Sequence, residues 1–171
     1  MQKPLVHIVG GFLGSGKTTA IAAAARRCIE AGQSVGVVTN DQGKYLVDTL
    51  FFRMNDVPSV EVTGGCFCCN FDQFEERLSA LNEAQQPDVI FAESVGSCAD
   101  IVATVVDPLL ELGRSGIRPA SFSVFADVRL LHQRLAGLPM PFSEDIVYIF
   151  DKLLEEAGQI VINKSDLADR K

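Results

Sequence analysis

A glycine-rich segment between an apolar run and a helical run restricts the fold more than any other feature of the chain. Residues 11–18 are Gly-Phe-Leu-Gly-Ser-Gly-Lys-Thr, which satisfies the pattern G-x-x-x-x-G-K-[ST]. Apolar residues 5–9 precede it and predict a buried strand, and alanine-rich residues 19–31 follow it and predict a helix. This strand–loop–helix context is the one in which the pattern binds phosphates, so we expect a P-loop.

The chemistry of a P-loop follows from its backbone. Glycines allow consecutive N–H groups, together with the N-terminus of the following helix, to point at an anion. Lys17 can then reach the β- and γ-phosphates of a nucleotide, and Thr18 can ligate Mg²⁺. The alternative, an ordinary glycine-rich turn, is disfavoured by the strand and the helix on either side. The residues expected to contact a nucleoside triphosphate are Gly11, Gly14, Ser15, Gly16, Lys17, Thr18 and Thr19.

Strand-like apolar runs alternate with helical patterns along the chain. Strands are expected at Leu5–Val9, Val35–Thr39, Ser59–Val62, Val89–Ala92, Ser121–Ala126 and Gln159–Ile162. Helices are expected at Thr19–Ala31, Phe71–Leu81, Asp100–Val106, Val128–Leu135 and Ser143–Ala157. The alternation predicts an α/β fold, the three-layer sandwich of P-loop NTPases, with a mostly parallel sheet and helices on both faces. Pro108 and residues 113–119 interrupt the pattern and are expected to form surface loops.

Length and composition predict one globular nucleotide-binding domain over residues 1–171, with 47% hydrophobic and 22% charged residues. The sequence ends where a further strand and helix would complete such a sheet, so we expect a C-terminally truncated fragment. A net charge of −7 argues against nucleic acid as a partner. No apolar run could span a membrane, and no signal-peptide layout is present. Five cysteines, three of them within four positions, favour a reducing cytoplasm over a secreted disulfide framework.

A second pattern, Asn163-Lys-Ser-Asp166, follows the last predicted strand about 145 residues after the P-loop. In GTPases the Asp of such an N-K-x-D element accepts hydrogen bonds from the N1–H and 2-amino groups of guanine. Its Lys packs across the base, and its Asn ties the loop to the P-loop region. Adenine lacks those two donors and would leave the carboxylate unpaired, a loss that discriminates strongly. Alone the pattern is a common surface turn; after a strand, Asn163, Lys164 and Asp166 predict GTP and GDP.

An acidic residue also ends the predicted strand Val89–Ala92. Glu93 opens the segment Glu-Ser-Val-Gly, which has the spacing of the D-x-x-G switch of GTPases with Glu in place of Asp. Glu93 could hold Mg²⁺ directly or through water, and Gly96 could offer its N–H to the γ-phosphate. Asp41 is a further candidate for holding Mg²⁺ or the attacking water. The alternatives are a solvated loop acid for Glu93 and a helix cap or turn residue for Asp41. Lys17, Asp41 and Glu93 are thus the candidate catalytic residues.

Three crowded cysteines form the other distinctive motif. Cys66, Cys68 and Cys69 follow two glycines, and thiolates are soft ligands that favour Zn²⁺, Cu⁺ or nickel-type ions. Three sulfurs leave a tetrahedral site one ligand short, which suits an ion that is handed on or a site completed by a second protomer or a nearby carboxylate. The alternatives are buried apolar cysteines or a redox pair of thiols. Cys98 is a possible fourth ligand, although a small buried residue is the favoured interpretation, and Cys28 is expected in the core.

Taken together, these motifs resemble the CobW-like branch of the metallochaperone GTPases, which are relatives of HypB and UreG. The similarity is carried by the P-loop at residues 10–19, the G-C-x-C-C motif at 65–69, the E-[ST]-x-G switch at 93–96 and the base-specificity loop at 163–166. It covers essentially the whole chain. The sequence departs from the family at Asn40-Asp-Gln-Gly43, where many members have N-E-F-G, and it lacks their histidine-rich stretches.

The resemblance implies a GTPase that couples nucleotide turnover to a zinc, cobalt or nickel-type ion and delivers it to a client. The client would be a metalloenzyme or a protein of a metal-cofactor pathway, and a homodimer is implied as well. Two other functions stay open: a P-loop small-molecule kinase, and a metal-binding scaffold that keeps a nucleotide only for stability. The N-K-x-D element and the lack of a recognisable arginine-bearing lid weigh against the kinase.

Overall fold

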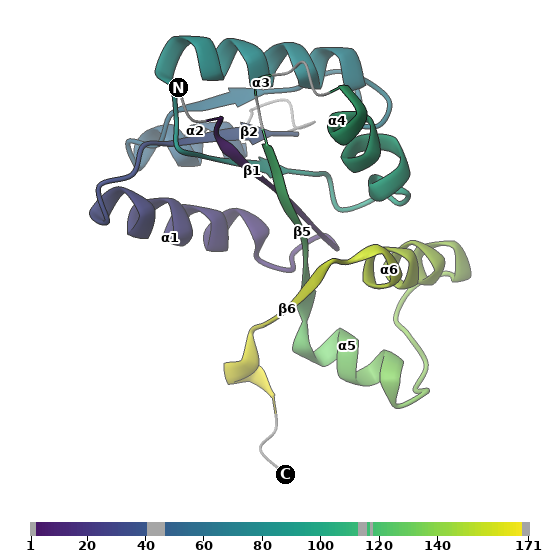
Figure 1. Ribbon diagram of the computed structural model, residues 1–171. Coiled ribbons are helices and arrows are strands. Elements are labelled where there is room, and N and C mark those ends of the chain that lie inside the picture. Colours follow the sequence, from purple (N-terminus) through teal and green to yellow (C-terminus); the bar gives the residue numbers. More distant parts are fainter. Residues whose placement is uncertain (1–2, 41–46, 113–115, 117, 169–171) are drawn as a thin grey trace.

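A twisted sheet of parallel strands forms the centre of the computed structural model, which describes residues 3–40, 47–112, 116 and 118–168 (Figure 1). Within these residues the sheet has six strands in the order β3-β2-β4-β1-β5-β6, and every pair is parallel. The strands are β1 (Leu5–Gly11), β2 (Val35–Thr39), β3 (Ser59–Glu61), β4 (Val89–Glu93), β5 (Arg118–Asp127) and β6 (Gln159–Asn163). The predicted α/β fold with a parallel sheet is therefore confirmed.

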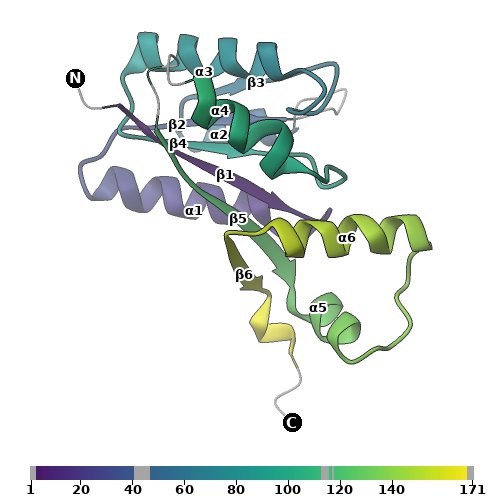
Figure 2. The ribbon, with the colours of Figure 1, turned by 45° about the vertical axis from the view of Figure 1, so that its right-hand side comes forward.

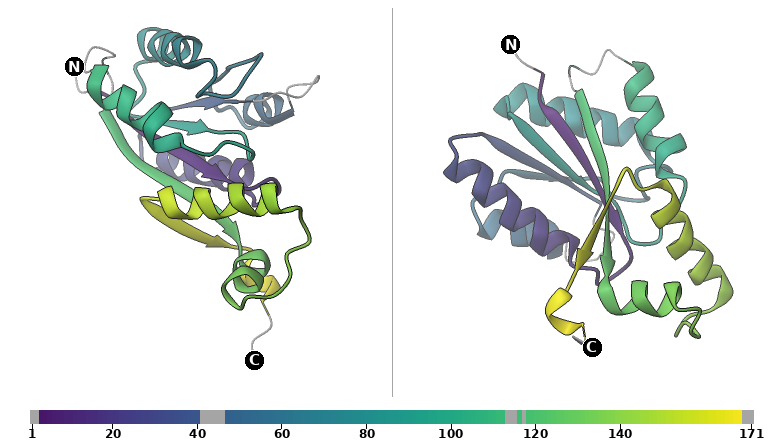
Figure 3. Two further views of the ribbon diagram at one scale, coloured as in Figure 1. Left: turned by 90° about the vertical axis from the view of Figure 1, so that its right-hand side faces the viewer. Right: turned by 60° about the horizontal axis from the view of Figure 1, so that its bottom comes forward.

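Helices connect the strands and cover both faces of the sheet. They are α1 (Lys17–Glu30), α2 (Val47–Met54), α3 (Phe71–Gln85), α4 (Asp107–Leu112), α5 (Val128–Leu135) and α6 (Glu144–Glu156). A π-helical turn, Val102–Val106, precedes α4, and a 3₁₀ turn, Ser165–Leu167, follows β6. Helix α1 lies on one side of the sheet, whereas α3, α4 and α6 lie on the other (Figures 2 and 3). None of the helices in the described ranges is both long enough and apolar enough to cross a membrane.

Two hydrophobic clusters follow from the alternation of side chains along the strands. In β1, Val6 and Ile8 belong to the cluster that packs against α3, α4 and α6, whereas Val9 belongs to the cluster with α1 and α2. Successive residues of a strand point to opposite faces, so a strand covered on both sides is apolar throughout. The inner strand β2 is buried at all five positions for this reason.

The register of the sheet brings the carboxyl ends of the strands together at one edge. Glu93, at the end of β4, pairs with Val9 of β1 on one side and with Thr39 of β2 on the other. At the other end of the row, Asp127 of β5 pairs with Asn163 of β6. Ligands of parallel α/β sheets bind at this edge.

The expected loops at Pro108 and residues 113–119 are partly wrong. Pro108 lies in the first turn of α4, directly after the π-helical turn, where the amide of Asp107 donates to the carbonyl of Val102. The wider turn accommodates a residue that has no N–H to donate. Arg118 and Pro119 belong to β5, and the register of β5 against β1 shifts just beyond Pro119, as expected for a proline within a sheet. Residues 113–115 and 117 lie outside the described residues.

Candidate functional site

The P-loop connects β1 to α1 and folds back on itself. The ammonium group of the buried Lys17 donates to the carbonyl of Gly11 at 2.9 Å. Gly16, the N-cap of α1, has a φ of 92°, and a Cβ there would lie 2.4 Å from Nδ2 of Asn163. Only glycine fits such a left-handed and crowded position. The predicted phosphate-binding residues lie at the end of β1 (Gly11), in the loop (Gly14, Ser15 and Gly16) and in the first turn of α1 (Lys17, Thr18 and Thr19).

The loop has the properties of an anion site. The hydroxyl of Ser15 is buried and has no hydrogen-bond partner within the described part of the chain. A buried polar atom without a partner costs about 1–3 kcal/mol, a cost that a bound ligand can remove. The N-terminus of a helix directs N–H groups at a ligand and carries a positive partial charge, and α1 begins two residues after Ser15. The arrangement therefore fits the phosphates of a nucleotide.

Two predicted ligands of Mg²⁺ lie in contact. The hydroxyl of Thr18 donates to Oε1 of Glu93 at 2.8 Å, although the two residues are 75 positions apart. Glu93 is only 5% exposed, so its carboxylate is removed from bulk water. Hydroxyl and carboxylate oxygens are the hard ligands that Mg²⁺ prefers. Asp41, the third candidate, lies outside the described residues.

The E-x-x-G segment is packed directly on the P-loop. The amide of Ser94 donates to the carbonyl of Val9 at 2.9 Å, which holds the segment against the end of β1. A Cβ on Gly96 would lie 2.6 Å from the backbone nitrogen of Leu13. Such a distance is shorter than any ordinary van der Waals contact, so the two loops touch through their backbones.

The base-specificity loop contacts the P-loop from the opposite side. The side-chain amide of Asn163 donates to the carbonyl of Ser15 at 2.8 Å across 148 positions of sequence. Lys164 has a left-handed backbone, with φ 58°, and its ammonium lies 3.0 Å from Oδ2 of Asp127. Asp166 is exposed in the 3₁₀ turn that follows, where its carboxylate is accessible to a ligand. The structure thus places Asn163 against the phosphate loop, as predicted, with Lys164 and Asp166 directly after it in the chain.

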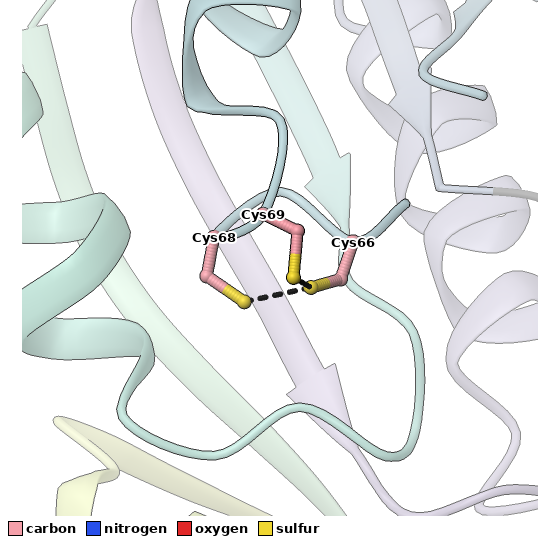
Figure 4. Close-up of side chains that lie close together, drawn as sticks. All are labelled: Cys66, Cys68 and Cys69. Atoms are coloured by element: carbon pink, nitrogen blue, oxygen red, sulfur yellow. Dashed lines mark hydrogen bonds between the residues drawn. The ribbon is translucent and has the colours of Figure 1, made fainter. Parts of the chain in front are cut away.

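The three clustered cysteines lie on the loop between β3 and α3, with their sulfurs turned toward one another (Figure 4). Sγ of Cys66 lies 2.7 Å from Sγ of Cys68 and 3.0 Å from Sγ of Cys69. All three sulfurs lie within 4.8 Å of one another, the only His, Cys, Asp or Glu group in the described ranges that is close enough to hold a metal ion. Soft thiolate ligands in this arrangement suit Zn²⁺ and related ions.

The pKa values of Cys66 and Cys68 favour the binding of a metal cation. Burial raises the pKa of Cys66, but the hydrogen bonds with Cys68 and Cys69 outweigh it and bring that pKa down to about 7. Burial, together with the neighbouring Cys66, raises the pKa of Cys68 to about 12. One sulfur is therefore readily ionised near neutral pH, while a second needs the field of a metal ion to lose its proton.

Comparison with known proteins agrees with this geometry. The sequence profile of the CobW/HypB/UreG nucleotide-binding domain matches residues 5–171, nearly the whole chain. The chain belongs to this family. Two curated relatives are similar to this CobW-family domain: the zinc chaperone CobW of a Sinorhizobium species, 28% identical over 95% of the chain, and the zinc chaperone YeiR of Escherichia coli, 30% identical over 94%. The chain spans about half the length of these relatives, 51% and 46% respectively.

A solved structure supports the fold of the CobW-family domain. The crystal structure of the Zn(II)-bound YjiA GTPase from E. coli superposes with a TM-score of 0.63 at 15% identity, covering 99% of this chain and 52% of that one. Its similarity at this level of identity concerns the fold alone.

Sequence reasoning missed Asp127, a buried carboxylate at the end of β5. Its oxygens accept hydrogen bonds from the backbone and guanidinium of Arg129 and from the ammonium of Lys164. The hydrogen bonds from Arg129, followed by that from Lys164, hold the pKa of Asp127 well below its usual range. A signal was present, because Asp127 directly follows the predicted strand Ser121–Ala126, just as Glu93 directly follows the predicted strand Val89–Ala92.

The remaining cysteines lie in packed positions. Cys98 is 5% exposed in the larger hydrophobic cluster, and burial raises the pKa of its thiol well above the ordinary range. It is not part of the group of sulfurs within 4.8 Å of one another. Cys28 packs from α1 against the second cluster. Cys66, Cys68 and Cys69 therefore form the group of thiols close enough to hold a metal ion, and Cys98 lies beside it, since its thiol interacts with those of Cys66 and Cys68.

Proposed function

We propose that this domain binds and hydrolyses GTP and uses the state of the nucleotide to control a soft divalent metal ion at Cys66, Cys68 and Cys69. The observation that carries the proposal is that the P-loop, the Glu93 segment and the cysteine trio all follow strand ends at one edge of the sheet. The ion is the cargo and is delivered to a client metalloenzyme or metal-cofactor pathway. Zinc is the first candidate, because two relatives are zinc chaperones and the YjiA structure contains Zn(II).

The hydrolytic part of the proposal assigns a role to each residue around the phosphates. Lys17 and the P-loop amides stabilise the charge that develops on the phosphates as the bond to water forms and the bond to GDP breaks. Thr18 and Glu93 hold Mg²⁺, with Asp41 as the third proposed ligand. Mg²⁺ supplies charge neutralisation to the β- and γ-phosphates when it is bound. Gly96 donates its N–H to the γ-phosphate, so the position of this residue depends on whether the γ-phosphate is bound.

Guanine selectivity is assigned to the base-specificity loop. Asp166 accepts from the N1–H and 2-amino groups of guanine, and the stem of Lys164 packs on the base. The support is the position of this loop beside Ser15 and its exposed carboxylate. The resemblance to metallochaperone GTPases supports a client protein as the acceptor of the ion and a homodimer as the working form.

Two measurements test the proposal. Lys17→Ala should lower steady-state GTP hydrolysis by at least about 100-fold, since charge stabilisation at the transferring phosphate is the main catalytic contribution. Equal rates in the two proteins would point instead to a scaffold that merely holds a nucleotide. Guanine selectivity is measured by comparing the affinities for GDP and ADP.

The metal part is tested by zinc affinity in the presence of Mg²⁺ with either a non-hydrolysable GTP analogue or GDP. We expect affinities that differ several-fold between the two nucleotide states. The triple variant in which Cys66, Cys68 and Cys69 become Ser should lose the ion. Cys28→Ser is the matched control, because it removes a thiol that lies outside the trio, and it should behave as wild type.

A further inference from the structure

Asn40, which follows β2, uses every hydrogen-bonding group of its side chain on the cysteine loop. It is 7% exposed. Its Nδ2 donates to the carbonyl of Gly65 at 2.7 Å and to that of Val62 at 3.3 Å. Its Oδ1 accepts from the amide of Phe67 at 3.2 Å. The carboxamide is therefore oriented unambiguously, since its donor faces two carbonyls and its acceptor faces an N–H.

These contacts bracket Cys66. The carbonyl of Gly65 and the amide of Phe67 belong to the two peptide groups on either side of this cysteine, so Asn40 fixes the backbone from which its sulfur projects. Cys66 is also the thiol that lies within 3.0 Å of both other sulfurs. Any displacement of its backbone therefore changes both sulfur–sulfur distances at once.

The other side of the cysteine loop is anchored in the core. Phe67 is fully buried, and its ring stacks on that of Phe74 in α3 with centroids 4.2 Å apart. The well-packed core resists displacement. The cysteine loop is thus held by the packing of Phe67 and by the hydrogen bonds from Asn40. Of these two contacts, the hydrogen bonds from Asn40 lie on the side of the nucleotide site.

The backbone of Asn40 is bonded to that site. Its N–H donates to the carbonyl of Glu93 at 3.1 Å. The side chain of Glu93 in turn accepts from the hydroxyl of Thr18 at 2.8 Å. Between the proposed Mg²⁺ ligands and Cys66 there is thus one bridging residue, held at both ends by hydrogen bonds.

We infer that Asn40 is a positioning residue that transmits the state of the nucleotide to the metal-binding thiols. The inference rests on the proposed function and names the residue through which it is regulated. A shift of the end of β4, when Mg²⁺ and the γ-phosphate bind or leave, moves the backbone of Asn40. Its carboxamide then moves the peptide groups on both sides of Cys66 and alters the spacing of the three sulfurs.

The experiment compares two asparagines of the same region. Asn40→Asp keeps the shape of the side chain but turns its donor into an oxygen that faces the carbonyls of Gly65 and Val62. Asn70→Asp is the matched control, since Asn70 donates to the carbonyl of Thr63 on the same loop but has no bond to Glu93. Asn40→Ala, which adds no charge, serves as the second test variant. Thermal unfolding checks that each variant is folded.

The measured quantity is the ratio of Zn²⁺ affinities with the GTP analogue and with GDP. Coupling between sites typically amounts to about 5- to 150-fold. We expect both Asn40 variants to bring the ratio to within about twofold of one, with nucleotide affinities unchanged, while Asn70→Asp keeps the wild-type ratio. The absorption bands of Co²⁺–thiolate bonding should differ between the two nucleotide states in wild type and coincide in Asn40→Asp.

Three outcomes overturn the inference. The first is a wild-type ratio in both Asn40 variants. The second is a loss of Zn²⁺ affinity that is equal in the two nucleotide states, which would make Asn40 a structural latch of the loop. The third is a ratio of one in the wild-type protein. Only this last result also refutes the nucleotide control in the proposed function, so the two failures are told apart by the wild-type measurement.

Discussion

At the scale of single residues, Asp127 shows how one buried carboxylate can organise a binding loop. It caps the N-terminus of α5 by accepting from the amide of Arg129, and it holds the guanidinium of the same residue at 2.7 and 3.0 Å. Its Oδ2 also lies 3.0 Å from the ammonium of Lys164. The ion pair fixes the tip of Lys164, so Asp127 also restricts the position of the Lys164 stem, which is proposed to pack on the base.

We therefore expect Asp127→Asn to weaken nucleotide binding. Loss of charged hydrogen bonds of this kind is worth about 1–2 kcal/mol, or roughly 5- to 30-fold in the dissociation constant for GDP. Calorimetric titration with GDP measures the change. Asp151→Asn is the matched control, because it breaks a similar bidentate pair with Arg134 between two helices. Unchanged GDP affinity in Asp127→Asn would remove this residue from the binding machinery.

The ionisation of Asp127 also makes the free energy of unfolding depend on pH. Hydrogen bonds from Arg129 and Lys164 hold its pKa in the folded protein below the value of an unfolded chain, about 3.9. A depressed pKa means that the stabilisation is complete above about pH 4 and is lost as the pH falls toward the folded-state value. The gap in unfolding free energy between wild type and Asp127→Asn should therefore narrow between pH 6 and pH 3.5. Urea unfolding at the two pH values measures it.

At the scale of elements, the E-x-x-G segment and the P-loop act as one unit because their backbones touch. The amide of Ser94 bonds to the carbonyl of Val9, and Gly96, the residue proposed to bind the γ-phosphate, lies against the backbone of Leu13. Backbone atoms, unlike the ends of flexible side chains, cannot move aside individually. The fit between the loops is thus sensitive to one methyl group.

Gly96→Ala tests this contact. The added Cβ would lie 2.6 Å from the nitrogen of Leu13 and 3.1 Å from its Cα, so one loop must shift. We expect GTP hydrolysis to fall by at least about tenfold, since misplacement by about 1 Å can cost 100-fold. Single-turnover hydrolysis measures the effect.

Gly32→Ala is the control for general destabilisation. Its added Cβ would meet nothing within 4 Å, but its φ of 82° strains alanine. It should therefore lower stability by about 1–2 kcal/mol while leaving hydrolysis unchanged. If the two variants lose activity equally, the contact between the loops has no special part in hydrolysis.

Elements also show what the sequence could predict and what it could not. The six strands were predicted because each is a compact apolar run, and the P-loop, E-x-x-G and cysteine motifs because their spacing is local. Helix α2 was not predicted, because it has only eight residues, about two turns, and such a short apolar pattern is difficult to recognise. The hydrogen-bond partners of Asn40 lie 22 to 53 positions away in the sequence, and those of Asp127 lie up to 37 positions away. No local pattern encodes contacts of this kind.

At the scale of the whole molecule, the order of the strands is also the order of the proposed sites. The cysteine loop follows β3 at one end of the row, the P-loop and Glu93 follow the central strands β1 and β4, and the base-specificity loop follows β6 at the other end. A nucleotide bound as proposed would therefore have its phosphates between its base and the three cysteines. We expect the ion to respond to the γ-phosphate and Mg²⁺ rather than to the identity of the base.

Coupling between two sites is reciprocal, which gives a prediction for the intact domain. If the GTP analogue changes the affinity for Zn²⁺ by some factor, Zn²⁺ must change the affinity for the analogue by the same factor. Suppose that the analogue strengthens Zn²⁺ binding, with a coupling of about 1–3 kcal/mol. The rise in Tm with both ligands should then exceed the sum of the separate rises by about 2–4 °C per kcal/mol of coupling. If the analogue weakens Zn²⁺ binding, the combined rise should fall short of the sum by a similar amount.

Differential scanning calorimetry of four samples, with neither ligand, each alone and both, measures this term. The variant with Ser at positions 66, 68 and 69 should keep the stabilisation by the analogue and lose the excess or deficit. If the two rises in Tm are strictly additive in the wild-type protein, the coupling free energy between the nucleotide site and the metal site is zero, although both lie at one edge of the sheet. The thiols would then bind an ion independently of GTP, and the proximity of the sites would have no role in its release.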